Sequence, residues 1–139
     1  HGELRQPTLA MADWLAKGQW GSPTGPKPKA PDYAGGMNNL DPPIACAAGS
    51  RGEGLASACR LAIKTGDTGR AGVYRKRLMA AARFALEAQY RPENSFWLRE
   101  PERARGGVRQ SLTDTTIRID YVQHCVSTWL GAIEILDRK

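Results

Sequence analysis

Two alanine-rich segments with a helical repeat, separated by a short turn, constrain the fold of this chain most strongly. The first starts at Ser50, and the second runs from about Ala71 to Gln89. Apolar residues recur at every third or fourth position in both segments, which gathers them on one side of a helix. Gly66 suits the position just after a helix end. Because so few residues join the segments, the sequence predicts an antiparallel αα-hairpin.

Two further helices are expected, one near each end of the chain. Residues 8–17 carry apolar side chains at helical spacing, with Pro7 before them and Gly18 after them. Residues 120–136 show a wider apolar side, and Asp120 suits an N-cap. The predicted fold class is therefore mainly α, with antiparallel helical hairpins joined by long loops.

Long connections separate these helices. Residues 18–43 hold most of the nine prolines and are predicted to form an irregular Pro/Gly-rich loop, followed by a helical core over 44–139. Between the last two helices, SFWL at 95–98 and GVRQSL at 107–112 could pair as a short β-hairpin. The length of 139 residues fits one domain spanning 1–139, or a fragment of a larger one.

Composition limits the partners and the location that can be expected. The formal net charge of +6 favours a carbohydrate or other anionic ligand, and nucleic acid is not expected because the charge is spread along the chain. No segment approaches the roughly 20 apolar residues that span a bilayer, so no membrane span is expected. The lack of a visible signal peptide favours the cytoplasm, although a signal removed before His1 would direct secretion.

The cysteines and histidines indicate no metal and no cofactor. Cys46, Cys59 and Cys125 lie among small apolar residues, as reduced core cysteines do, and one disulfide with a spare thiol is the alternative. With only His1 and His124 present, a zinc site lacks ligands. An N-terminal histidine can chelate copper together with a second histidine, but that arrangement is usually built on a β-sandwich.

Two acids are the first candidates for chemistry. Glu53 and Asp120 are each expected in the first turn of a helix, shortly after Arg51 and Arg118. Two carboxylates facing one cleft could divide general acid and general base catalysis if their environments separate their pKa values. The alternative is that both acids only cap helices, Glu53 through a capping box with Ser50.

A histidine lies one helical turn after the second acid. The Asp120 carboxylate could orient the imidazole of His124 for acid–base catalysis near neutral pH. Tyr121 and Gln123, its neighbours, could donate hydrogen bonds to a ligand. The alternative is that His124 is a structural residue at a helix–helix contact and that its neighbours only cover the edge of the core.

The segment 99–118 is rich in arginine and could bind an anion. Arg109 and Arg118 carry planar guanidinium groups that suit carboxylates. Trp97, just before this segment, could stack on a sugar ring. The alternative is a solvated basic loop whose arginines pair with nearby acids and whose aromatic residue anchors it to the core. Those acids would be Glu100, Glu102 and Asp114.

The order of elements over residues 44–136 resembles that of α/α-toroid proteins, in which helical hairpins stand in a ring. Residues 47–62 and 106–136 resemble the entries to inner toroid helices, because glycine and charged residues lead directly into an apolar helix. The resemblance implies a carbohydrate-active enzyme, such as a glycoside hydrolase, a sugar epimerase or a polysaccharide lyase. It also implies a longer protein or association with other copies, since a closed ring of six hairpins needs roughly 300 residues.

Two functional hypotheses follow. The first is an acid–base enzyme acting on an anionic sugar, in which one cleft is formed by Glu53, Asp120, His124, Arg51, Arg109 and Arg118. Its proton-transfer residues would be Glu53, Asp120 and His124. Its substrate-binding residues would be Arg51, Arg109, Arg118, Tyr121, Gln123 and Trp97. The alternative is a non-catalytic helical module that binds a protein partner or an anionic polymer through the basic 99–118 loop.

Overall fold

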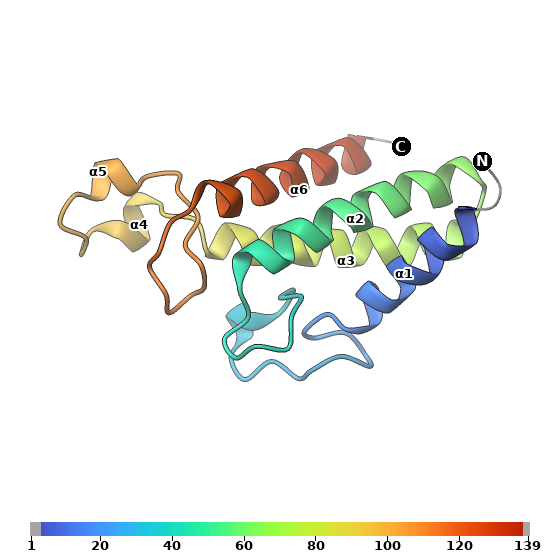
Figure 1. The fold of residues 1–139 in the computed structure, drawn as a ribbon, viewed down its shortest axis with the longest axis horizontal. Helices are drawn as coiled ribbons and strands as arrows, with labels where there is room; N and C mark the ends of the chain where they lie inside the picture. The colour runs from blue at the N-terminus through green and yellow to red at the C-terminus, as the bar shows by residue number, and fades with distance from the viewer. Residues whose placement is uncertain (1–3, 138–139) are drawn as a thin grey trace.

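The computed structural model describes residues 4–137, and within them the chain is mainly helical, which confirms the predicted fold class (Figure 1). The long helices are α1 (Arg5–Lys17), α2 (Ala45–Lys64), α3 (Thr68–Glu87) and α6 (Ile119–Asp137). The short elements are the 3-10 turn η1 (Pro31–Tyr33) and the helices α4 (Pro92–Ser95) and α5 (Pro101–Ala104). His1, for which copper chelation was considered and not favoured, lies outside the described residues.

Helix α2 is the centre of the fold. It runs antiparallel to α3 as the predicted αα-hairpin, and α6 and α1 pack on it along two different sides (Figure 1). Helices α1 and α6 do not contact each other within residues 4–137. The short helices α4 and α5 form an arm that projects beyond the end of the bundle (Figure 1). None of the helices in the described part is both long enough and apolar enough to span a bilayer.

Glycines let α2 and α6 approach each other closely. An added Cβ at Gly52 would lie 2.5 Å from Oγ1 of Thr128, and one at Gly49 would lie 2.9 Å from the backbone nitrogen of Cys125. An added Cβ at Gly131 would lie 2.7 Å from Cβ of Ala56. The buried Thr128 hydroxyl donates a hydrogen bond to the Gly49 carbonyl across this seam. This close spacing determines which polar side chains of the two helices can touch.

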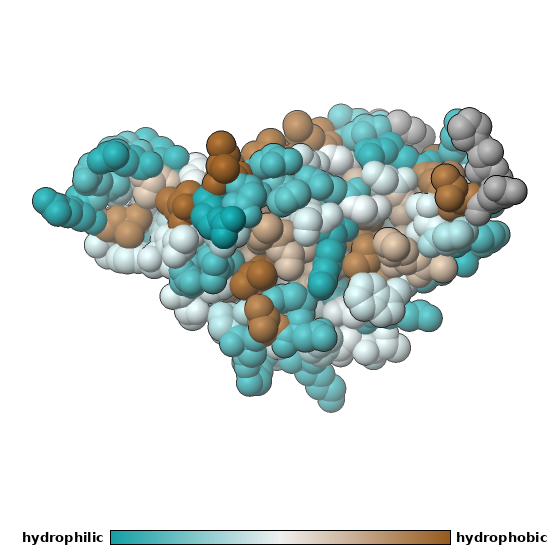
Figure 2. All heavy atoms as spheres, viewed as in Figure 1, coloured by the Kyte–Doolittle hydropathy of each residue, from teal (hydrophilic) through white to brown (hydrophobic). Residues whose placement is uncertain are grey.

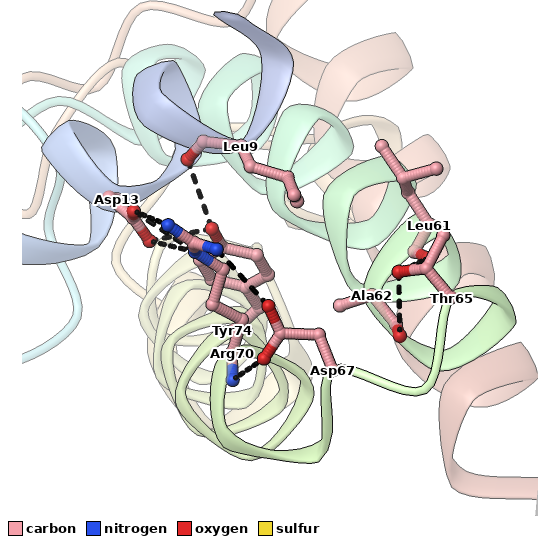
Figure 3. A network of polar contacts seen from close by, with 8 residues as sticks. All are labelled: Leu9, Asp13, Leu61, Ala62, Thr65, Asp67, Arg70 and Tyr74. Atoms are coloured by element: carbon pink, nitrogen blue, oxygen red, sulfur yellow. Dashed lines mark hydrogen bonds and ion pairs between the residues drawn. The ribbon is translucent and has the colours of Figure 1, made fainter. Parts of the chain in front are cut away.

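A half-buried polar network holds α1 against the hairpin (Figure 3). The Arg70 guanidinium bridges the carboxylates of Asp13 and Asp67, at 3.1 Å from each. The Tyr74 hydroxyl donates to Oδ1 of Asp13 at 2.6 Å, and the Leu9 carbonyl oxygen lies 3.0 Å away. Burial alone would raise the pKa of Asp13, but the hydrogen bonds from Tyr74 and Arg70 outweigh burial and hold that pKa below its ordinary value.

The predicted start of α2 is wrong, because tertiary contacts determine where the helix begins. The helix begins at Ala45, whose N–H donates to the Gln110 carbonyl at 2.7 Å, and the N–H of Ile44 donates to Oδ1 of Asn38 at 3.2 Å. Distant residues therefore satisfy donors that a local cap would otherwise serve. Ser50 lies inside the helix, so the predicted capping box does not form.

The Pro/Gly-rich loop packs on α3. The side-chain amide of Gln19 donates to the carbonyls of Gly35 and Arg77, at 3.1 and 2.9 Å. Gly35 has a φ of +97° and leaves no room for a side chain, because an added Cβ would lie 2.1 Å from the Ala80 carbonyl oxygen. Met37 is buried, as the packing of this segment on the core requires.

The predicted β-hairpin between 95–98 and 107–112 does not form. Residues 92–95 are helical instead, and Val108 makes an isolated antiparallel bridge with Gln89. Two further bridges join Arg109 to Ile117 and Ser111 to Ile44. The segment after α5 therefore ties the ends of α2 and α3 together rather than pairing with its own arm.

Candidate functional site

Glu53 and His124 meet across the α2–α6 seam. Oε1 of Glu53 lies 3.2 Å from Nδ1 of His124, and both side chains are about one-third exposed, at 33% and 30%. When Nδ1 carries the proton it donates to the carboxylate, which leaves Nε2 as a free acceptor. Gly49 and Gly52 make this contact possible, because they let the backbones of α2 and α6 approach each other closely.

Asp120 does not orient His124, contrary to the expectation from their spacing. Its carboxylate accepts from Nε of Arg118 at 3.1 Å, and the Arg118 guanidinium carbon lies 5.3 Å from the ring centroid of Tyr121. Glu53, from the other helix, supplies the carboxylate beside the imidazole instead. The sequence therefore suggested the wrong carboxylate as the partner of His124.

Cys46, at the start of α2, is a half-buried thiol. Burial raises the pKa of Cys46, the charges of Asp120 and Glu53 raise it further, and Arg118 opposes them. Burial also raises the pKa of Cys125 to about 12, so neither cysteine provides a thiolate at neutral pH. None of the three cysteines forms a disulfide, as the leading interpretation predicted.

A shallow groove of about 310 Å³ starts at Glu53 and follows the seam. Arg60 of α2 forms an ion pair with Glu134 of α6 at 2.9 Å and donates to the Ser57 hydroxyl at 3.0 Å. The sequence analysis missed these three lining residues. Their spacing of four and seven positions after Glu53 could have identified Ser57 and Arg60, because such residues share one face of a helix. The groove thus offers a carboxylate at one end and hydrogen-bonding groups along its length.

Three of the predicted substrate-binding residues make other contacts. Arg109 donates to the Glu87 carbonyl at 3.1 Å and lies over the ring of Tyr90, with 5.6 Å from guanidinium carbon to ring centroid. The Tyr121 hydroxyl donates to Oε1 of Gln110 at 2.6 Å. The Trp97 indole, on the exposed arm, donates to the carbonyl three residues before it. These contacts fix loops and helix ends.

The remaining two substrate-binding candidates differ in their position. Arg51 is half-buried on α2, and since residues two apart on a helix do not share a face, it points away from Glu53. Gln123 is exposed on α6 beside His124, where a ligand of that histidine could contact it.

Arginines of the 99–118 loop form ion pairs with nearby acids, as the alternative of a solvated basic loop predicted. Arg103 pairs with Glu100 and Arg105 with Glu102, both at 2.8 Å. Asp114, expected as a further arginine partner, instead accepts from the side-chain amide of Gln110 at 2.8 Å. Exposed pairs of this kind contribute little to stability, but they reduce the positive field that an anionic polymer would meet.

No metal site competes with the groove among residues 4–137, since they hold no group of three or more His, Cys, Asp or Glu side chains arranged to bind an ion. Comparison with protein-family models, with curated proteins and with solved structures finds no match to this chain. The function is therefore inferred from the geometry of the Glu53–His124 pair and its groove.

Proposed function

We propose that this chain carries out acid–base chemistry on an anionic sugar, as part of an α/α-toroid-like carbohydrate-active enzyme. The observation that carries the proposal is the contact of Nδ1 of His124 with Oε1 of Glu53, whose side chain also lines one end of a solvent-open groove. A carboxylate that holds one imidazole nitrogen and leaves the other free is a common arrangement of a general base. Asp120, one turn before His124 on α6, forms an ion pair with Arg118, which lies just before the helix.

The chemistry follows from the two nitrogens of the imidazole. Glu53 accepts the Nδ1 proton, so Nε2 of His124 is free to take a proton from the substrate. The negative charge of Glu53 then stabilises the imidazolium that forms. In a uronate, the most acidic carbon-bound proton lies next to the carboxyl group, and its removal leads to epimerisation or to elimination of the neighbouring sugar. Arg118, which is exposed, could exchange its Asp120 partner for the substrate carboxylate.

The proposal is tested with oligosaccharides and polysaccharides that contain uronic acids. Elimination is followed by the ultraviolet absorbance of the unsaturated product, and epimerisation by solvent deuterium incorporated next to the carboxyl group. We expect His124→Gln to lower kcat by on the order of a hundredfold or more, as loss of a general base does. Glu53→Gln should lower kcat as well and shift the pH profile, because the imidazolium loses its counter-charge.

The matched control is Glu93→Gln, which removes one exposed carboxylate on α4, away from the groove. It should leave kcat and KM unchanged. Two results would overturn the proposal. One is a wild-type protein that turns over none of the uronate substrates, and the other is a His124→Gln variant that keeps the wild-type kcat.

A further inference from the structure

A pocket of about 450 Å³ lies between α1, α3 and the loop that follows α1. Small-molecule sites in proteins have volumes of roughly 300–1,000 Å³, so the pocket is large enough to hold a ligand. It shares no lining residue with the groove at Glu53. It also lies apart from α6, whose hydrophobic side chains gather along one edge of the molecule (Figure 2) and which does not contact α1 within the described residues. The pocket is therefore separate from the candidate site.

Hydrogen bonds to the backbone hold the loop in place around this pocket. The side-chain amide of Gln19, which is fully buried, donates to the Arg77 carbonyl at 2.9 Å and ties the loop to α3. The hydroxyls of Ser22 and Thr24 both donate to the Lys17 carbonyl and tie the loop to the end of α1. Because the loop is anchored to both helices, the walls of the pocket are already in position before a ligand binds.

Two cations line the pocket without a carboxylate partner. Neither Lys17, in the last turn of α1, nor Arg77, on α3, forms an ion pair within residues 4–137. The acid that lines the pocket is Asp13, but its carboxylate already accepts from Arg70 and Tyr74, and Lys17 acts on it only from a distance. Two like charges at one cavity repel each other, and an anion bound between them removes that repulsion.

Apolar side chains complete the walls. Ala16, Pro23 and Val73 line the pocket, and Val73 is 49% exposed. Val73 and Arg77 lie four positions apart on α3, so a ligand body that packs on Val73 has its charged end beside Arg77. The planar guanidinium suits a carboxylate or a phosphate, which it binds through two parallel hydrogen bonds, and the Lys17 ammonium adds a point charge.

We propose that this pocket binds a small organic anion, in which an apolar body carries one carboxylate or phosphate group. The anionic group lies between Lys17 and Arg77, and the apolar body packs on Val73 and Pro23. Such a ligand contacts α1, α3 and the loop at once, so its binding stabilises the docking of α1 on the hairpin. This inference is independent of the proposed chemistry, because none of its residues belongs to the α2–α6 seam.

The test titrates the isotope-labelled chain with phenyl phosphate or benzoate and follows the backbone amide signals by NMR. We expect saturable shifts at Lys17, Thr24 and Arg77, with a Kd on the order of 1 mM, which suits ligands of about ten heavy atoms. Benzamide and benzylamine keep the aromatic ring but are neutral and cationic. Both should bind at least about tenfold more weakly, since they lose the attraction to the two cations.

Substitutions locate the anionic group. Lys17→Gln and Arg77→Gln should each raise the Kd about tenfold, because each removes one charge-assisted contact. Lys76→Gln and Arg83→Gln are the matched controls, since both side chains are exposed on α3 outside the pocket, and they should keep the wild-type Kd. Val73→Glu places a carboxylate one turn before Arg77, where it competes with the ligand and should abolish binding. Circular dichroism checks that each variant keeps its helices.

Four results would each overturn the proposal. One is that neither anion shifts the amide signals of the pocket at concentrations up to about 10 mM. Another is that benzamide binds as tightly as benzoate, which would mean that the two cations contribute nothing. A third is that Lys17→Gln and Arg77→Gln keep the wild-type Kd. The last is that the shifts occur only around Gln123 and His124, which would place the anion at the candidate site instead.

Discussion

Replacing Gly52 by alanine should destabilise the fold, although alanine is the better helix former. An alanine Cβ at this position would lie 2.5 Å from Oγ1, 2.6 Å from Cγ2 and 3.1 Å from Cβ of Thr128. All three atoms belong to one short, buried side chain. Rotating that side chain away would break its hydrogen bond to the Gly49 carbonyl, so the change can be accommodated only by moving the helices apart.

The expected change in the free energy of unfolding combines two destabilising effects and one stabilising effect. Overpacking a core costs about 1–3 kcal/mol, and loss of a buried hydrogen bond adds about 1 kcal/mol. The intrinsic helix preference of alanine over glycine returns about 1 kcal/mol. The net loss for Gly52→Ala is therefore about 2 kcal/mol. In a domain of this size that corresponds to a fall in Tm of about 8 °C, measured by circular dichroism at the helical band.

Gly72→Ala is the matched control, because Gly72 lies inside α3 and an added Cβ there meets nothing within 4 Å. This variant should gain up to about 1 kcal/mol. A double-mutant cycle with Thr128→Ala should then show that Gly52→Ala costs much less once Oγ1 and Cγ2 are gone. The reasoning is refuted if Gly52→Ala is as stable as Gly72→Ala, or if the two seam substitutions are additive.

Two further predictions concern titration. The folded pKa of Asp13 lies below its unfolded value, so the stability it contributes is present above the ordinary carboxyl pKa and lost as pH falls through the folded value. Asp13→Asn should therefore lower Tm at pH 7, with the gap to wild type closing in acid; an equal gap at every pH would contradict this. Cys46 should react with a maleimide more slowly than a peptide thiol at neutral pH, and Asp120→Asn should accelerate it, as followed by intact mass spectrometry. An unchanged rate in Asp120→Asn would argue against the electrostatic cause.

The elements that the sequence predicted correctly are those whose causes are local. The αα-hairpin follows from apolar periodicity and from Gly66, which adopts a φ of +72° at the turn. The start of α2 could not be predicted, because its first donors are satisfied by Asn38 and by the Gln110 carbonyl. Those partners come close only once the loops before and after the hairpin have folded.

The sequence suggested candidate residues for the site, but it did not predict which of their side chains contact each other. Glu53 and His124 lie 71 positions apart, and no periodicity relates them. Their contact depends on the distance between α2 and α6. That distance depends on small residues such as Gly49, Gly52 and Gly131, whose role is visible only when the two helices are placed side by side. The local spacing of Asp120 and His124 suggested the wrong pair, because in a first helical turn an adjacent arginine competes for the carboxylate.

Helix α6 has one side that faces α2 and one side that is exposed to solvent. His124, Thr128 and Gly131 face α2, where they set the spacing of the seam and the contact with Glu53. Ile119 and Ile133 are exposed. Substituting either isoleucine by a polar residue should therefore leave the Glu53–His124 pair in place. Gly52→Ala should instead widen the seam and move the Glu53 carboxylate away from the His124 imidazole.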